Sequence, residues 1–116
     1  MPRPEDTIRM RHMLEHAEEA VSYARGKARA DLDSDRILSL ALVPLLEIVG
    51  EAGSRVSEEG RAEVTSIVWP QIIGLRNRIV HGYDAVDMDI VWVILTNDLP
   101  PLIAELEKIL PPDPKG

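Results

Sequence analysis

The stretch ILSLALVPLLEIV, residues 37–49, decides the fold that this sequence can adopt. Its apolar residues surround a helix almost completely, whereas a helix wetted on one side needs a single apolar face. The apolar run is too short to span a bilayer, which needs about 20 residues. The sequence therefore predicts a central helix, or one that buries a second face against another subunit. Pro44 removes one backbone hydrogen bond, so we expect a kink there.

The segments before this stretch also have helical patterns. We expect the central helix to run from about Asp35 to Ser57, with Asp33 or Ser34 as its N-cap and Gly60 closing the segment. A first helix is expected from about Glu5 to Lys27, before a break that begins at Gly26. Its apolar residues recur at spacings of three and four, the pattern of a one-sided stripe: Met10, Met13, Leu14, Ala17, Ala20, Val21 and Ala24.

Two more helical regions follow. The third is expected to open at Pro70 and to stop at Gly82. The fourth is expected to begin at a cap formed by Asp84 or Asp87, and to be bent or divided at Pro100-Pro101. Residues 1–116 then form one all-α domain, an antiparallel four-helix bundle, with the first few residues and the tail 111–116 flexible.

Composition excludes several classes of protein. The net charge of −7 argues against a protein that coats nucleic acid through many basic contacts, although it allows an enzyme that meets RNA at one small basic spot. Cysteine is absent, which excludes disulfides and fits a reducing cytoplasm. The N-terminal residues carry charges where a signal peptide needs an apolar run. We therefore expect a cytoplasmic protein that does not associate with membranes.

The stretch RNRIVHGY, residues 76–83, places two arginines, a histidine and a tyrosine together in an acidic chain. Arg76 and His81 are five residues apart and would point roughly 140° away from each other on an ideal helix. They could converge if the helix ends near Val80, if Arg76 bends, or if two subunits meet. Asn77 and His81 share a face while the helix lasts. The simplest interpretation is structural, since basic residues favour a helix C-terminus.

This stretch and its flanks resemble the HepT family of HEPN-domain ribonucleases. The motif Arg76-x4-His81-x-Tyr83 matches the family's arginine–x4–histidine–x–tyrosine pattern. The flanks match as well, in EIVGEAGSRVS (47–57), WPQIIGLRNRIVHGYDAVD (69–87) and VWVILTNDLPPLI (91–103). The resemblance covers about residues 5 to 110. It favours a functional interpretation of the motif.

The resemblance implies metal-independent RNA cleavage, with no cofactor. The central helix, apolar almost all round, and the divided geometry of the motif predict a homodimer. Arg76 would hold the phosphate and its transition-state charge, and His81 would transfer a proton. Asn77 could orient the histidine or the phosphate, and Arg78 could bind RNA or simply be solvated. Tyr83 would be the residue to which a nucleotidyltransferase antitoxin of the MNT type attaches AMP, unless it only packs at a helix corner.

Other polar residues have simpler explanations. Glu47 and Glu51, four residues apart, could line the site, but a plain polar edge explains them as well. Helix capping explains three carboxylates before the fourth helix better than metal binding does: Asp84, Asp87 and Asp89. Two rival functions remain open, a non-catalytic HEPN module that binds a nucleotidyltransferase or a nucleotide, and a purely structural dimerisation bundle.

Overall fold

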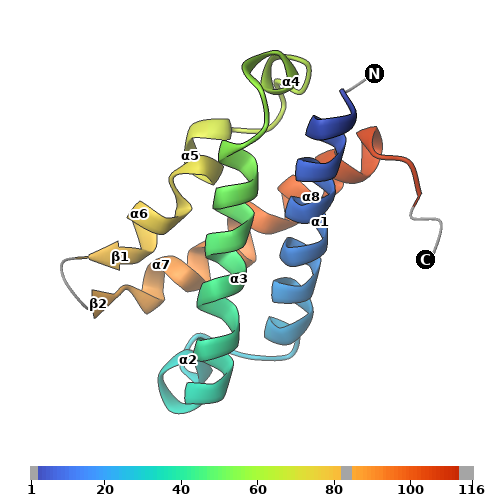
Figure 1. The fold of residues 1–116 in the computed structure, drawn as a ribbon. Coiled ribbons are helices and arrows are strands. Elements are labelled where there is room, and N and C mark those ends of the chain that lie inside the picture. The colour runs from blue at the N-terminus through green and yellow to red at the C-terminus, as the bar shows by residue number, and fades with distance from the viewer. Residues whose placement is uncertain (1–2, 82–84, 113–116) are drawn as a thin grey trace.

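Four helical regions build the fold in a computed structural model, which describes residues 3–81 and 85–112. In chain order their elements are α1 (Pro4–Ala24), α2 (Asp31–Ser34), α3 (Arg36–Ser54), α4 (Glu58–Ala62), α5 (Trp69–Ile73), α6 (Leu75–Ile79), β1 (Val80–His81), β2 (Ala85–Val86), α7 (Met88–Val93), the π-helical turn η1 (Ile94–Asp98) and α8 (Leu99–Ile109). Figure 1 shows α3 between α1 and the pair α5–α6, with the chain of α7, η1 and α8 crossing behind. The predicted all-α, four-helix architecture is confirmed.

The core is aliphatic, as a chain without phenylalanine requires. Residues with no exposed surface come from all four helical regions, and they include Met10, Met13, Leu42, Leu46, Val49, Leu75, Ile79, Leu99 and Leu106. The helix α3 contributes to this core along its length. By length and composition alone α3 could also cross a membrane, a test that the core helix of a soluble protein passes equally.

The beginning of α3 differs from the prediction. Its N-cap is Asp35, whose carboxylate accepts a hydrogen bond from the Leu38 amide at 3.1 Å. Asp33 and Ser34 are not the cap, because they belong to the short helix α2. The helix continues through Pro44 and ends at Ser54. The kink expected at Pro44 stays a prediction.

A buried polar junction joins the start of α1 to the start of α4. Asp6 is 3% exposed, and its carboxylate accepts hydrogen bonds from the Ser57 amide at 2.8 Å and the Ser57 hydroxyl at 2.6 Å. Gly60 lies within α4 rather than closing the preceding segment, and a Cβ there would stand 2.4 Å from Asp6 Oδ2. The glycine is therefore required by the close approach of Asp6.

The first helix ends earlier than expected, and the tail is only partly described. α1 stops at Ala24, just before Gly26, which adopts a left-handed φ of 78°. The flexibility expected of the tail falls largely outside the described residues, which end at residue 112. Within them, the carbonyl of Pro111 accepts a hydrogen bond from the Arg11 guanidinium.

The third region is not the single helix that was predicted from Pro70 to Gly82. It divides at Gly74, and α6 ends at Ile79. Val80 is extended, and residues 80–81 pair with residues 85–86 in an antiparallel register that sets Val80 opposite Val86 and His81 opposite Ala85. The motif therefore lies across the junction of a helix and a short hairpin.

The fourth region changes from π-helical to α-helical hydrogen bonding just before the double proline, where a bend or a division was predicted. The Leu99 amide donates to the Ile94 carbonyl, five residues earlier, which is the hydrogen bond of a π-helical turn. Pro100 and Pro101 have no amide hydrogen to give, so α8 begins with them in its first turn. Asp87 is the cap of α7, while the alternative cap, Asp84, lies outside the described residues.

Candidate active site on α6

The orientation of α6 is fixed by two core residues. Leu75 and Ile79 are four residues apart, so they share a helix face, and both are fully buried. Arg76 and Asn77 follow Leu75 around the helix and are exposed. The helix therefore presents Arg76 and Asn77 to solvent because its apolar pair is buried in the core.

Arg76 faces α3. Its Nε lies 3.7 Å from Glu47 Oε2, and its side chain is 78% exposed. Arg76 and Glu47 line an open hollow of about 400 Å³ together with Pro44, Ile48 and Glu51 of α3. The structure thus brings Arg76 next to Glu47, for which the sequence allowed either a place in the site or a plain polar edge, and it places both residues at an accessible surface.

Arg78 faces the opposite way, because two residues along a helix correspond to a rotation of about 200°. Its Nη1 lies 2.5 Å from Asp98 Oδ2 on η1, and the two side chains are 29% and 14% exposed. This part-buried ion pair anchors α6 to the fourth helical region. The sequence did not identify Asp98, whose position just before a Leu-Pro pair resembles that of an ordinary cap.

The end of α6 changes the geometry between Arg76 and His81. The Val80 amide donates to the Arg76 carbonyl, and the Asp87 amide donates to the Ile79 carbonyl at 2.8 Å. The helix therefore stops before His81, which belongs to β1. The helix does end near Val80, one of the three conditions under which Arg76 and His81 could converge, and their convergence stays a prediction. The shared helix face expected for Asn77 and His81 does not apply, because His81 lies in β1. Tyr83 lies outside the described residues.

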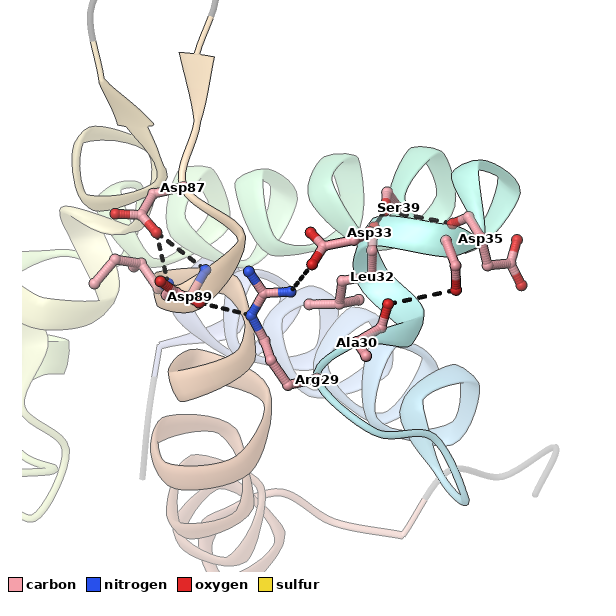
Figure 2. Close-up of polar contacts among 10 residues, drawn as sticks. Arg29, Ala30, Leu32, Asp33, Asp35, Ser39, Asp87 and Asp89 are labelled. Atoms are coloured by element: carbon pink, nitrogen blue, oxygen red, sulfur yellow. Dashed lines mark hydrogen bonds and ion pairs between the residues drawn. The ribbon is translucent and has the colours of Figure 1, made fainter.

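The return of the hairpin is held by a polar network, shown in Figure 2. Asp87 Oδ1 accepts hydrogen bonds from the amides of Asp89 and Ile90 at 3.0 and 3.1 Å, which confirms its capping role. Arg29 bridges Asp89 at 2.7 Å and Asp33 of α2 at 3.0 Å. The start of α7, and with it the second strand of the hairpin, is therefore tied to α2.

Other polar side chains have local partners, among them Glu51 and the two histidines of α1. Glu51 forms an ion pair with Arg55, one turn later on the same surface, in which Arg55 Nη2 lies 3.1 Å from Glu51 Oε1. His16 Nδ1 lies 2.7 Å from the carbonyl of His12 on the exposed side of α1. Across residues 3–80 and 85–112, no group of three or more carboxylates and histidines is arranged to hold a metal ion.

The chain is similar to known proteins over most of its length. The family model described as ribonuclease HepT-like matches residues 13–109. A candidate RNase of Caldanaerobacter subterraneus subsp. tengcongensis is 30% identical over 109 residues, which cover 94% of this chain and 94% of that protein. A candidate RNase of Methanocaldococcus jannaschii is 26% identical over 95 residues, 82% of this chain and 87% of that protein.

A candidate ribonuclease HepT of Thermococcus cleftensis is 28% identical over 79 residues, which cover 68% of this chain and 72% of that protein. No solved structure matches the chain. The family match extends from α1 to the end of α8, so it includes α3, α6 and the hairpin that carry the candidate site. The chain belongs to the HepT-like ribonuclease family.

Proposed function

We propose that the protein is the cytoplasmic toxin of a type II toxin–antitoxin pair, a metal-independent endoribonuclease whose site combines Arg76 and His81. The observation that carries this proposal is the position of Arg76. It projects from a helix that is fixed by two buried residues, it is open to solvent, and its helix ends before His81. A phosphate in solution has access to such a guanidinium.

The proposed reaction uses the RNA's own nucleophile. The ribose 2′-oxygen attacks the adjacent phosphorus and gives up its proton, the bond from phosphorus to the 5′-oxygen breaks, and that oxygen takes up a proton. His81 supplies proton transfer, because histidine is the side chain that titrates near neutral pH. Arg76 holds the phosphate with parallel hydrogen bonds as its negative charge grows. Asn77, exposed beside Arg76, would orient the phosphate.

Arg78 has a smaller part in the proposal. Its ion pair with Asp98 occupies the guanidinium and directs it away from Arg76. A contribution to RNA binding would require that pair to open. We therefore assign Arg78 a supporting role, mainly in holding α6 in place.

Tyr83 is proposed as the control point. Attachment of AMP to its hydroxyl by an MNT-type nucleotidyltransferase antitoxin would put a phosphate two residues from His81. That added negative charge would compete with the RNA phosphate for Arg76 and block access to the site. The antitoxin is thus both an enzyme that acts on this chain and its binding partner.

The proposed active form is a homodimer that packs through α3. This helix has an exposed apolar stripe, whose residues recur at spacings of three and four: Ile37, Leu40, Pro44 and Ile48. Pro44 and Ile48 also line the hollow beside Arg76. A second copy seated on the stripe would reach the site directly, which gives a composite active site at the interface.

The dimer is tested by light scattering at micromolar concentration. Leu40→Lys places a charge within the stripe and is expected to yield a monomer with unchanged helix content. The matched control is Ile8→Lys, a similarly exposed apolar residue on α1, which is expected to remain a dimer. A monomeric wild type, or a Leu40→Lys variant that stays dimeric, would contradict packing through α3.

The catalytic proposal is tested by RNA cleavage in vitro and by growth inhibition on expression without the antitoxin. Arg76→Ala and His81→Ala are each expected to lower cleavage by about 100-fold or more and to abolish toxicity, because each removes transition-state stabilisation. Arg25→Ala, which removes one exposed arginine at the end of α1, is the control and is expected to cleave normally.

The competing function is a non-catalytic HEPN module that binds the nucleotidyltransferase. The net charge of −7 and the engagement of Arg78 by Asp98 favour it, since they reduce the basic surface offered to RNA. A wild-type protein that leaves RNA intact but binds the nucleotidyltransferase tightly would establish this alternative and overturn the nuclease.

A further inference from the structure

The hollow between α3 and α6 is lined by two carboxylates, Glu47 and Glu51, that have different ion-pair partners. Glu51 is engaged by Arg55, whose Nη2 lies 3.1 Å from Glu51 Oε1. Glu47, one turn earlier on α3, has Arg76 of α6 as its ion-pair partner at 3.7 Å. The same helix therefore supplies one carboxylate that is satisfied locally and one that reaches across to the candidate site.

The contact with Glu47 leaves the outer part of Arg76 accessible. The closest approach is at Nε, and the arginine side chain is 78% exposed. A guanidinium has five N–H donors in a planar fork, so a carboxylate on the Nε side is compatible with a second anion on the terminal Nη edge. That terminal edge can bind phosphate with two parallel hydrogen bonds.

Glu47 also restrains the guanidinium of Arg76, an exposed side chain. An exposed arginine has many side-chain rotamers, and ordering it on substrate binding costs free energy. An ion pair at 3.7 Å is longer than a hydrogen bond, so it restrains the guanidinium without enclosing it. Of the other residues that line the hollow, Pro44 and Ile48 have apolar side chains, and Glu51 is paired with Arg55.

From these contacts we infer that Glu47 is a positioning residue, which holds the Arg76 guanidinium by its Nε side and presents the Nη edge to the RNA phosphate. This inference rests on the proposed nuclease function and deepens it. Glu47 acts through Arg76 and does not touch the reacting atoms. Its negative charge also repels RNA, so positioning and binding oppose each other.

That opposition gives a kinetic signature. Glu47→Gln removes the charge and keeps the side-chain shape. Loss of positioning is expected to lower kcat about fivefold, in line with the modest strength of exposed ion pairs. Loss of repulsion is expected to lower KM as well. Glu51→Gln is the matched control, because it removes the same charge from the same hollow. It is expected to lower KM slightly and to leave kcat unchanged.

The second readout needs no RNA. The Nε–Hε resonance of Arg76, identified by its absence from Arg76→Ala, reports the environment of this guanidinium in ¹H–¹⁵N NMR spectra at low temperature and mildly acidic pH. Glu47→Gln is expected to shift this resonance toward that of a free arginine side chain. Glu51→Gln is expected to leave it in place.

The two readouts separate this inference from the proposed function. Equal kcat values for the two glutamine variants, or an Arg76 resonance that ignores Glu47→Gln, would overturn the positioning role. A variant with lower KM and undiminished kcat would show that Glu47 only repels RNA, which also overturns it. A wild type that leaves RNA intact would overturn the proposed function, and the NMR comparison would then decide alone whether Glu47 holds Arg76.

Discussion

Asp6 on α1 and Glu47 on α3 are carboxylates in opposite surroundings. Asp6 is 3% exposed and accepts two hydrogen bonds of 2.8 and 2.6 Å from Ser57. The Glu47 side chain is 35% exposed and faces its partner, Arg76, across 3.7 Å. The first contact closes the junction of α1 and α4, and the second stands at the edge of an open hollow.

This contrast separates the residues that stabilise the fold from those expected to serve its function. A buried carboxylate depends on its hydrogen bonds, because an unsatisfied charge inside a protein is costly. An exposed pair contributes little to stability, since water screens it, and its members remain free to meet a ligand. We therefore expect changes at Asp6 to act on folding and changes at Arg76 and Glu47 to act on RNA cleavage.

The largest effect on stability is expected at Asp6. Burial by itself would raise the pKa of Asp6, but hydrogen bonds from Ser57 and the charges of Arg3 and Arg61 hold its pKa below the usual value of 3.8. The ionised form therefore stabilises the fold above that pH. Asp6→Asn is expected to lower the free energy of unfolding by about 2 kcal/mol at pH 7.

The pH dependence of the stability lost in Asp6→Asn shows whether the charge of Asp6 or the shape of its side chain stabilises the fold. As the pH falls through the pKa of folded Asp6, the wild type loses the stabilisation that the ionised carboxylate provides. The difference in free energy of unfolding between wild type and Asp6→Asn should therefore shrink. Urea titrations from pH 7 to pH 3 measure it, with Glu5→Gln, an exposed carboxylate in the same first turn, as the control. A gap that does not change with pH would contradict an electrostatic role for Asp6.

A smaller effect of opposite sign is expected at Glu18, an exposed carboxylate of α1 near α8. Burial and the charges of Glu107 and Glu15 raise the pKa of Glu18 above its usual value of 4.5. The ionised form therefore opposes folding at neutral pH. Glu18→Gln is expected to stabilise the protein by roughly 0.3 kcal/mol at pH 7, a value reduced for solvent screening.

The gain from Glu18→Gln should vanish below pH 4.5, where the wild-type side chain is protonated in both states. The double variant with Glu107→Gln should gain less than the sum of the two single changes, because both remove the same repulsion. Thermal unfolding at pH 7 and pH 3.5 makes the comparison. A loss of stability at pH 7 would show that Glu18 has an attractive partner instead.

Much of the fold was predictable because helix periodicity is local. Apolar patterns together with the residues that begin and end helices located all four helical regions. Asp87 was one of the two caps expected for the last region, and the double proline marked where that region was expected to bend or divide. These features depend on residues within a turn or two of each other. The same is true of the exposed stripe on α3, since a helix that is apolar almost all round leaves some apolar surface uncovered in a small domain.

The features that escaped prediction depend on distant residues. α6 ends at Ile79, not at Gly82, because the Ile79 carbonyl is satisfied by the amide of Asp87 from the returning strand. Arg76 and Arg78 have the same local sequence context, yet one faces Glu47 and the other is paired with Asp98 of η1. Such partners are set by tertiary packing and leave no signal in the spacing of the motif.

The decisive experiment is RNA cleavage by the purified wild type and by His81→Ala, each with a metal chelator present. We expect that the wild type cleaves RNA without metal, that His81→Ala cleaves at least about 100-fold more slowly, and that both proteins have the same thermal stability. Equal cleavage by the two proteins, or a wild type that leaves RNA intact, would contradict the proposed nuclease function.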